Sequence, residues 1–162
     1  MKMNVDAILE IFHRHKVDTI LIGGMNFLLR HQPVLTFDVD FWVRDTDENL
    51  SRVTAALREL DAQWGKNEKT WGPLAANHDW RNQSVFCMTT QHGAIDIFRE
   101  VRGLENQYTS CYDRSLLEQT ASGISYRSLS DKDMLACQLA LPENERRLDR
   151  VAFLKNHLEQ SS

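Results

Sequence analysis

The stretch from Ile20 to Phe41 constrains this chain more than any other part of it. It ends in the run Asp38-Val39-Asp40-Phe41, in which acidic and apolar residues alternate. That alternation predicts a strand with both carboxylates on one face and both apolar side chains in the core. Two carboxylates on one face repel each other, and buried neighbours increase the cost. A divalent cation bound to both would remove this repulsion, so the pattern predicts an oxygen-ligand metal site.

A glycine pair, Gly23-Gly24, separates the apolar run at 20–22 from an apolar, helix-like segment. Glycines at a strand-to-helix turn let the backbone approach a ligand closely, and the next helix offers N–H groups to phosphate. A Gly-Gly step by itself is more often a plain turn, and many Asp-x-Asp pairs simply lie at exposed strand ends. The two features at this spacing are a much stronger signal for a nucleotide site.

The order of these residues resembles a family signature. A hydrophobic residue and Gly-Gly, thirteen intervening residues, and then Asp-hydrophobic-Asp-hydrophobic is similar to the pattern of the nucleotidyltransferase superfamily, the DNA polymerase beta-like fold. That family needs a third carboxylate on a later strand, and Asp96 in the alternating run 93–98 matches it. Thr36 matches the Thr-x-Asp-x-Asp form of small bacterial members, which include the AbiEii-type toxins of type IV toxin–antitoxin pairs. The resemblance spans about residues 8–154, but only these three motifs are specific.

The resemblance implies an α/β (α+β) fold, a small mixed sheet flanked by helices with a helical C-terminal cap. We expect one domain over 1–162, with the catalytic core in about 1–104 and a mainly helical part in 105–162. Periodicity and turn signals predict its elements. Helices are expected at 5–12, 25–31, 46–60, 108–120, 130–142 and 148–158, and strands at 19–22, 36–43, 84–88, 94–99 and 124–129. Residues 66–82 show no periodicity and are expected to form a long loop or irregular hairpin.

The resemblance also assigns roles to residues. Asp38, Asp40 and Asp96 are the expected catalytic and metal-binding residues, with Mg²⁺ or Mn²⁺ as the metal and a nucleoside triphosphate as the substrate. Asp38 and Asp40 would ligate the nucleotide-side ion, and Asp96 would join the acceptor-side ion or take the hydroxyl proton. The expected nucleotide-binding residues are Gly23, Gly24, Thr36, Arg146 and Arg147.

Other cations and aromatic residues are further candidates for the same site. Arg30, His31, Arg44 and Arg150 are each expected to be surface charges. Trp71 and Trp80 are candidates to stack on a base, but a loop tryptophan more often anchors a core. Two positions depart from the AbiEii-like pattern: Gln138 stands where a lysine is usual, and Val34 where a basic residue is common.

The leading hypothesis is therefore a magnesium-dependent nucleotidyltransferase that moves NMP from NTP to a hydroxyl on tRNA, a protein or a small molecule. The alternative is a catalytically inactive binding module with the same fold, acting on a cognate partner protein in a two-component pair. A metal-dependent phosphohydrolase is a third reading, but no His-Asp dyad or other hydrolase spacing is evident.

Composition sets outer limits on these functions. The 162 residues are 42% hydrophobic and 26% charged, which is ordinary for one globular domain. A net charge of −4 argues against a strongly basic nucleic-acid binder but leaves room for a local basic groove. We expect a cytoplasmic protein with no membrane partner, because no secretory signal or membrane-length apolar run is evident. Cys87, Cys111 and Cys137 are odd in number and widely spaced, which predicts reduced thiols.

Overall fold

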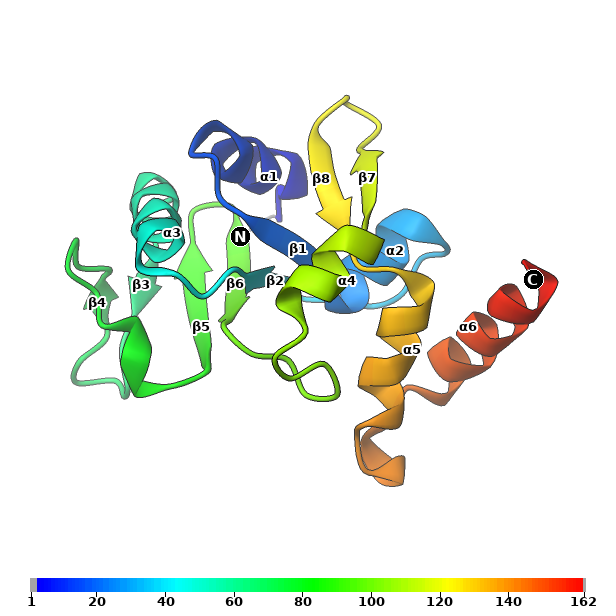
Figure 1. Ribbon diagram of the computed structural model, residues 1–162. Coiled ribbons are helices and arrows are strands. Elements are labelled where there is room, and N and C mark those ends of the chain that lie inside the picture. The colour runs from blue at the N-terminus through cyan, green and yellow to red at the C-terminus, as the bar shows by residue number, and fades with distance from the viewer. Residues whose placement is uncertain (1–2, 162) are drawn as a thin grey trace.

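A computed structural model describes residues 3–161 and contains one eight-stranded mixed sheet (Figure 1). The strand order across the sheet is β4-β3-β5-β6-β2-β1-β8-β7. The strands are β1 (Thr19–Ile22), β2 (Asp38–Val43), β3 (Gln63–Trp64), β4 (Gly72–Pro73), β5 (Val85–Thr90), β6 (Gly93–Phe98), β7 (Leu116–Gln119) and β8 (Ser125–Ser128). The helices are α1 (Val5–Arg14), α2 (Gly23–Arg30), α3 (Asp47–Glu59), α4 (Tyr108–Arg114), α5 (Asp131–Leu139) and α6 (Leu148–Gln160). The expected mixed sheet with flanking helices and a helical C-terminus is confirmed.

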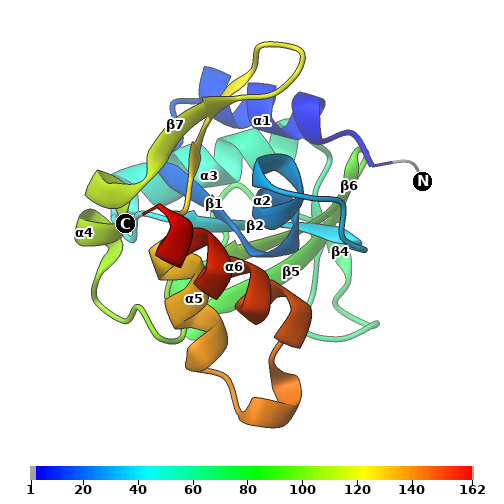
Figure 2. The same ribbon diagram turned by 90° about the vertical axis from the view of Figure 1, so that its right-hand side faces the viewer.

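The central strands bury apolar side chains on both faces of the sheet. On one face Val39, Phe41 and their neighbours pack with α1 and α3 in the larger hydrophobic cluster. On the other face Ile22 and Trp42 belong to a second cluster with residues of α5 and α6. Figure 2 shows α5 and α6 packed beside each other, across the sheet from α1 and α3. Because side chains alternate along β2, its even-numbered residues, the two aspartates included, face the α5–α6 side.

Side-chain caps begin several of the helices. Asn4 caps α1 by accepting from the backbone N–H of Ala7 at 3.1 Å, and Ser130 caps α5 by accepting from Asp133 N at 3.2 Å. Thr46 caps α3, since its Oγ1 accepts from Asn49 N at 3.2 Å.

The predicted helix at 108–120 is wrong in its second half. Helix α4 ends at Arg114, and Leu116–Gln119 form strand β7, which pairs antiparallel with β8. The reason is a tight turn at 120–124, where Thr120 N donates to Ile124 O and Gly123 adopts a φ of +86°. A left-handed glycine closes a hairpin readily but interrupts a helix. Strand β8 then joins the sheet by pairing parallel with β1 at Leu21 and Ser128.

The segment 66–82 is the expected irregular excursion, with the short strand β4 and a 3₁₀ turn at Trp80–Asn82. Trp80 anchors it, because this ring is buried and its Nε1 donates to Thr54 Oγ1 at 2.9 Å. Trp71 remains 41% exposed.

All three cysteines are free thiols. Among residues 3–161, no helix has both the length and the apolar character that a membrane crossing requires.

Candidate active site

Three carboxylates predicted from the sequence meet on neighbouring central strands. Strands β2 and β6 pair in parallel with Asp40 directly opposite Asp96, and Asp38 opposite Ala94. One carboxylate oxygen from each of Asp38, Asp40 and Asp96 lies within 4.8 Å of the other two. The strand register therefore makes one cluster of acidic groups that lie far apart in the sequence.

This cluster, the carboxylate triad, is electrostatically unsatisfied. Burial, followed by the charges of Asp38 and Asp96, raises the pKa of Asp40 to about 8. Burial and the hydrogen-bonded Asp38 raise the pKa of Asp96 to about 6. Within residues 3–161, the buried Oδ1 of Asp40 has no hydrogen-bond partner. A bound cation would relieve both the repulsion and the unpartnered oxygen.

Gly23 lets the start of α2 lie directly against the triad. Its φ is +73°, and a Cβ built on it would lie 2.5 Å from Oδ2 of Asp40. A side chain here would be strained by the backbone and would also displace the carboxylate. The residue before it, Ile22, provides no side-chain cap for α2 within the described chain. The N-terminus of α2 therefore presents its N–H groups and its positive dipole end beside three carboxylates.

Gly24 and Thr36 form the second close contact at this site. A Cβ on Gly24 would lie 3.1 Å from Thr36 Oγ1 and 3.3 Å from Arg150 Nη2. Thr36 Oγ1 also donates to the backbone oxygen of Asp38 at 3.2 Å. This hydroxyl therefore fixes the entry into β2 and keeps the aspartate strand next to the glycine turn.

Comparisons with known proteins identify the fold that carries this site. The sequence matches no protein-family model, and no curated protein matches it significantly. Solved structures match over nearly the whole chain. A proposed nucleotidyltransferase, TM1012 from Thermotoga maritima, is 15% identical with a TM-score of 0.56, covering 96% of this chain and 91% of the other. ANT(2")-Ia in complex with adenylyl-2"-tobramycin is 11% identical with a TM-score of 0.58, covering 95% and 87%.

The chain has the nucleotidyltransferase fold. The similarity at this level of identity concerns the fold, so the chemistry must be argued from the residues of this chain.

On this nucleotidyltransferase fold, an open cleft of about 710 Å³ lies beside the triad. Gly24, Val34, Thr36, Asp38 and Asp40 line it together with two arginines, Arg147 and Arg150. Arg150 comes from α6 and reaches Gly24, and burial, followed by the charge of Arg147, lowers its pKa. From the sequence, Arg150 is one of several candidate cations for the triphosphate and is expected to be a surface charge. The sequence does carry an indication of this placement, because Arg150 lies three residues after Arg147, about one helical turn along the same face.

The two predicted arginines differ in their surroundings. Arg147 lines the cleft, and its backbone N–H donates to Gln138 Oε1 at 2.8 Å. Arg146 instead donates from Nε to Leu141 O and from Nη2 to Leu139 O, both at 3.0 Å. Gln138 thus holds the segment that carries Arg147.

The other candidate cations lie elsewhere. Arg44 pairs with Asp18 and lies over the ring of Tyr108. Arg30 and His31 were expected at the surface, but both are largely buried against Asp131 at the far end of α2. Their predicted exposure is wrong because α5 and α6 cover the end of α2.

A second, mainly apolar cavity of about 240 Å³ shares Asp40 and Arg150 with the open cleft. Residues of the sheet, α5 and α6 line it, among them Ile22, Phe98 and Met134. Asp40 therefore borders both the open cleft and the apolar cavity.

The donor set of the triad fits a hard divalent cation. All its ligand atoms are carboxylate oxygens, which suit Mg²⁺ or Mn²⁺ better than a soft metal. The unpartnered Oδ1 of Asp40 and the room left by Gly23 are consistent with an ion at this point. Asp38, Asp40 and Asp96 are the residues that would hold it.

Proposed function

We propose that this protein is a metal-dependent nucleotidyltransferase that moves a nucleoside monophosphate from an NTP to a hydroxyl acceptor. The observation that carries this proposal is the convergence of Asp38, Asp40 and Asp96 against Gly23 at the uncapped N-terminus of α2. Acidic metal ligands and a phosphate-binding helix end within one site are the two components that such a reaction needs. The shared fold supports the same class of reaction.

In this proposal each part of the site has its own task. Bound Mg²⁺ or Mn²⁺ would neutralise phosphate oxygens and lower the pKa of the acceptor hydroxyl. Asp38 and Asp40 would hold the ion on the nucleotide side. Asp96 would accept the proton of the attacking hydroxyl or hold an ion on the acceptor side.

The triphosphate would lie in the polar cleft. Backbone N–H groups at Gly24 and the guanidinium groups of Arg147 and Arg150 supply the positive potential that three phosphates require. Thr36 sets the geometry between Gly24 and Asp38. Arg146 was also predicted to bind nucleotide, and its bonds to Leu139 and Leu141 suggest that it supports this role by shaping the segment before α6.

Two classes of acceptor hydroxyl follow from this proposal. One structural neighbour holds an adenylylated aminoglycoside, which favours a small-molecule hydroxyl as the first class to test. A tRNA or a protein hydroxyl is the second, following the resemblance to AbiEii-type toxins, and a cognate partner protein belongs with that reading. The inactive binding module remains the alternative function, with Gln138 and Val34 as its motivation.

A transfer assay with labelled nucleotide tests the proposal. The protein is incubated with each NTP labelled at the α-phosphate, with Mg²⁺ or Mn²⁺, and with panels of aminoglycosides, tRNA and cell protein. Label should move to one acceptor class with release of pyrophosphate, and Asp40→Asn should abolish the transfer. A parallel assay with γ-labelled NTP should leave the acceptor unlabelled. Release of γ-phosphate without any α-label transfer would contradict the proposal and support a phosphohydrolase.

A further inference from the structure

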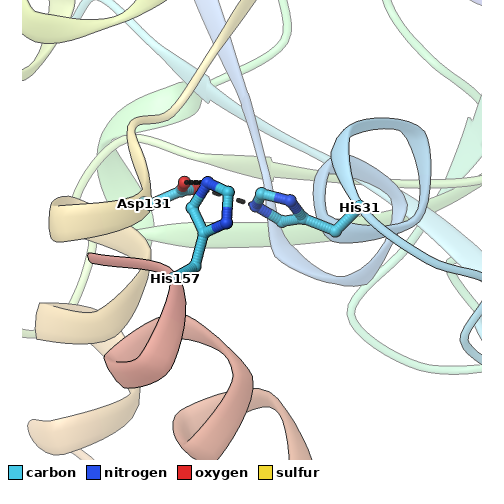
Figure 3. A group of neighbouring side chains, drawn as sticks. All are labelled: His31, Asp131 and His157. Carbon is cyan, nitrogen blue, oxygen red and sulfur yellow. Dashed lines mark hydrogen bonds and ion pairs between the residues drawn. The ribbon is translucent and has the colours of Figure 1, made fainter. Parts of the chain in front are cut away.

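A second group of potential metal ligands lies at the opposite end of α2 from the triad (Figure 3). His31 follows the last turn of α2, Asp131 begins α5, and His157 lies in the last turn of α6. His31 Nε2 is 2.7 Å from Asp131 Oδ1, and His157 Nε2 is 3.3 Å from Asp131 Oδ2. One ligand atom from each residue lies within 4.8 Å of the others. Three separate helices therefore direct two imidazoles at one carboxylate.

The surroundings of this group are apolar on one side and open on the other. The side chains of His31 and Asp131 are 6% and 9% exposed, whereas that of His157 is 43% exposed. Phe153 lies against both imidazole rings, with centroids 4.9 Å from His31 and 5.9 Å from His157. Phe27 packs edge-on against His31 at 5.3 Å. An ion here would be shielded by the aromatic rings and still reachable by solvent past His157.

The charged side chains around the group include more carboxylates than cations. Arg30 Nη2 lies 3.2 Å from Asp131 Oδ1, and Arg30 Nη1 lies 3.7 Å from Glu118 Oε1. With neutral imidazoles, two carboxylates face one guanidinium, so the group carries a net charge of −1. A metal ion supplies the missing charge, as does a proton on one histidine.

We propose that His31, Asp131 and His157 bind a transition-metal ion of the Zn²⁺ class, with a solvent molecule on the open side as the fourth ligand. Imidazole nitrogen and carboxylate oxygen are ordinary zinc ligands, and zinc sites with three protein ligands leave one position to water. Ligand atoms about 2.0 Å from a tetrahedral ion lie about 3.3 Å apart. The 3.3 Å between His157 Nε2 and Asp131 Oδ2 has this value, whereas His31 Nε2 lies 2.7 Å from the other oxygen, Oδ1, so one ion would require a small shift of His31 and a rotation of the Asp131 carboxylate.

This site differs from the triad in its ligand atoms and in the helices that a bound ion would connect. The triad offers oxygens alone, whereas the His31–Asp131–His157 group adds two nitrogens and so selects Zn²⁺, Co²⁺ or Ni²⁺ over Mg²⁺. An ion here joins α2, α5 and α6. Since Arg150 extends from α6 into the cleft, the same ion would hold that helix in place without touching the nucleotide. The inference stands apart from the proposed function.

Cobalt spectroscopy tests this site directly. The background is the full-length Asp38→Asn/Asp40→Asn protein, in which the triad is disabled. Titration with Co²⁺ should give visible ligand-field bands of a four-coordinate ion that saturate at one ion per chain, and Zn²⁺ should displace them. His157→Gln, at the most exposed ligand, should remove the bands, and the matched control His13→Gln on the exposed end of α1 should keep them.

The opposite results overturn the proposal. Absence of saturable bands in the background protein, or bands that survive His157→Gln, would show that the group is only an ion-pair cluster. Asp131→Asn provides a second variant, expected to weaken Co²⁺ binding at least tenfold, and circular dichroism checks that each variant is folded. Because the readout is a spectrum in a protein without the triad, its outcome is independent of nucleotide transfer.

Discussion

Gly23 and Asp40 are in contact: a Cβ on Gly23 would lie 2.5 Å from the Oδ2 atom of Asp40. This relationship joins the glycine turn of the sequence motif to its second aspartate. It makes the glycine a steric requirement of the carboxylate position, beyond its conformational role at φ +73°.

Gly23→Ala should therefore lower stability and disturb the site together. The left-handed backbone costs about 1–2 kcal/mol for a residue with a Cβ, and the clash adds to it, so we expect a loss of at least ~2 kcal/mol. Gly123→Ala is the matched control, because Gly123 has φ +86° but its Cβ would meet no described atom within 4 Å. Urea unfolding should show a loss of about 1 kcal/mol for the control. Equal losses in the two variants would contradict the contact.

Without metal, the folded protein should lose stability as pH rises. The pKa of Asp40 is raised to about 8 in the folded state from its ordinary value of 3.8, so folding favours the protonated form. This contribution is fully present below about pH 4 and is lost as pH rises through about 8. Asp40→Asn, which stays neutral, should be the more stable protein at pH 8.5 in EDTA, by an amount on the order of a few kcal/mol.

Melting temperatures of both proteins at pH 5.5 and 8.5 check this. The difference between the two melting temperatures should be larger at pH 8.5. Millimolar Mg²⁺ should raise the melting temperature of the wild type at that pH by binding to the carboxylates. Glu68→Gln, at an exposed loop position, is the control for a generic loss of negative charge. Parallel pH curves for wild type and Asp40→Asn would show that Asp40 carries no such repulsion.

Arg150→Gln should weaken nucleotide binding by about 10- to 100-fold, the value of one or two charge-assisted hydrogen bonds to phosphate. Mn²⁺ binding to the triad without nucleotide should be retained, which separates this effect from misfolding. Arg58→Gln, an exposed position on α3, is the control. Unchanged NTP affinity in Arg150→Gln, measured by calorimetry, would remove this residue from the nucleotide site.

Trp80→Phe should change stability and leave nucleotide affinity untouched. Its indole N–H bond to Thr54 is buried, so its loss should lower the free energy of unfolding by about 1 kcal/mol. Trp71→Phe, at a position that is 41% exposed, should have little effect. A large drop in NTP affinity for Trp80→Phe would instead support the idea that this ring stacks on a base.

The central strands and the shared face of Asp38 and Asp40 follow from local sequence. Because a strand has a period of two, alternation in 38–41 places Asp38 and Asp40 on one face of their strand, and alternation in 93–98 places Asp96 on the same face of its own strand as Ala94 and Phe98. That the strands of Asp40 and Asp96 would be direct neighbours rested on the family resemblance, since periodicity does not determine strand order. The structure supports their proximity, while their catalytic and metal-binding roles remain predictions.

The parts that the sequence did not predict depend on tertiary contacts. The sequence predicts helix where strand β7 forms, because the turn at Gly123 and the pairing with β8 decide the conformation of that segment. It predicts a surface position for Arg150, because only the packing of α6 brings this side chain to Gly24. The meeting of His31, Asp131 and His157 depends on three helices that are distant along the chain.

The most direct test of the central claim is a thermal shift of the purified protein with each NTP, with and without Mg²⁺. Ligand that binds only the folded state raises the melting temperature. A ligand concentration 100 times the Kd adds about 2.7 kcal/mol to the free energy of unfolding. The account predicts a shift that requires Mg²⁺, depends on the base, and disappears in Asp38→Ala/Asp40→Ala. A wild type that shows no shift with any NTP at millimolar concentration, or a variant that shifts equally, would contradict a nucleotide site at the carboxylate triad.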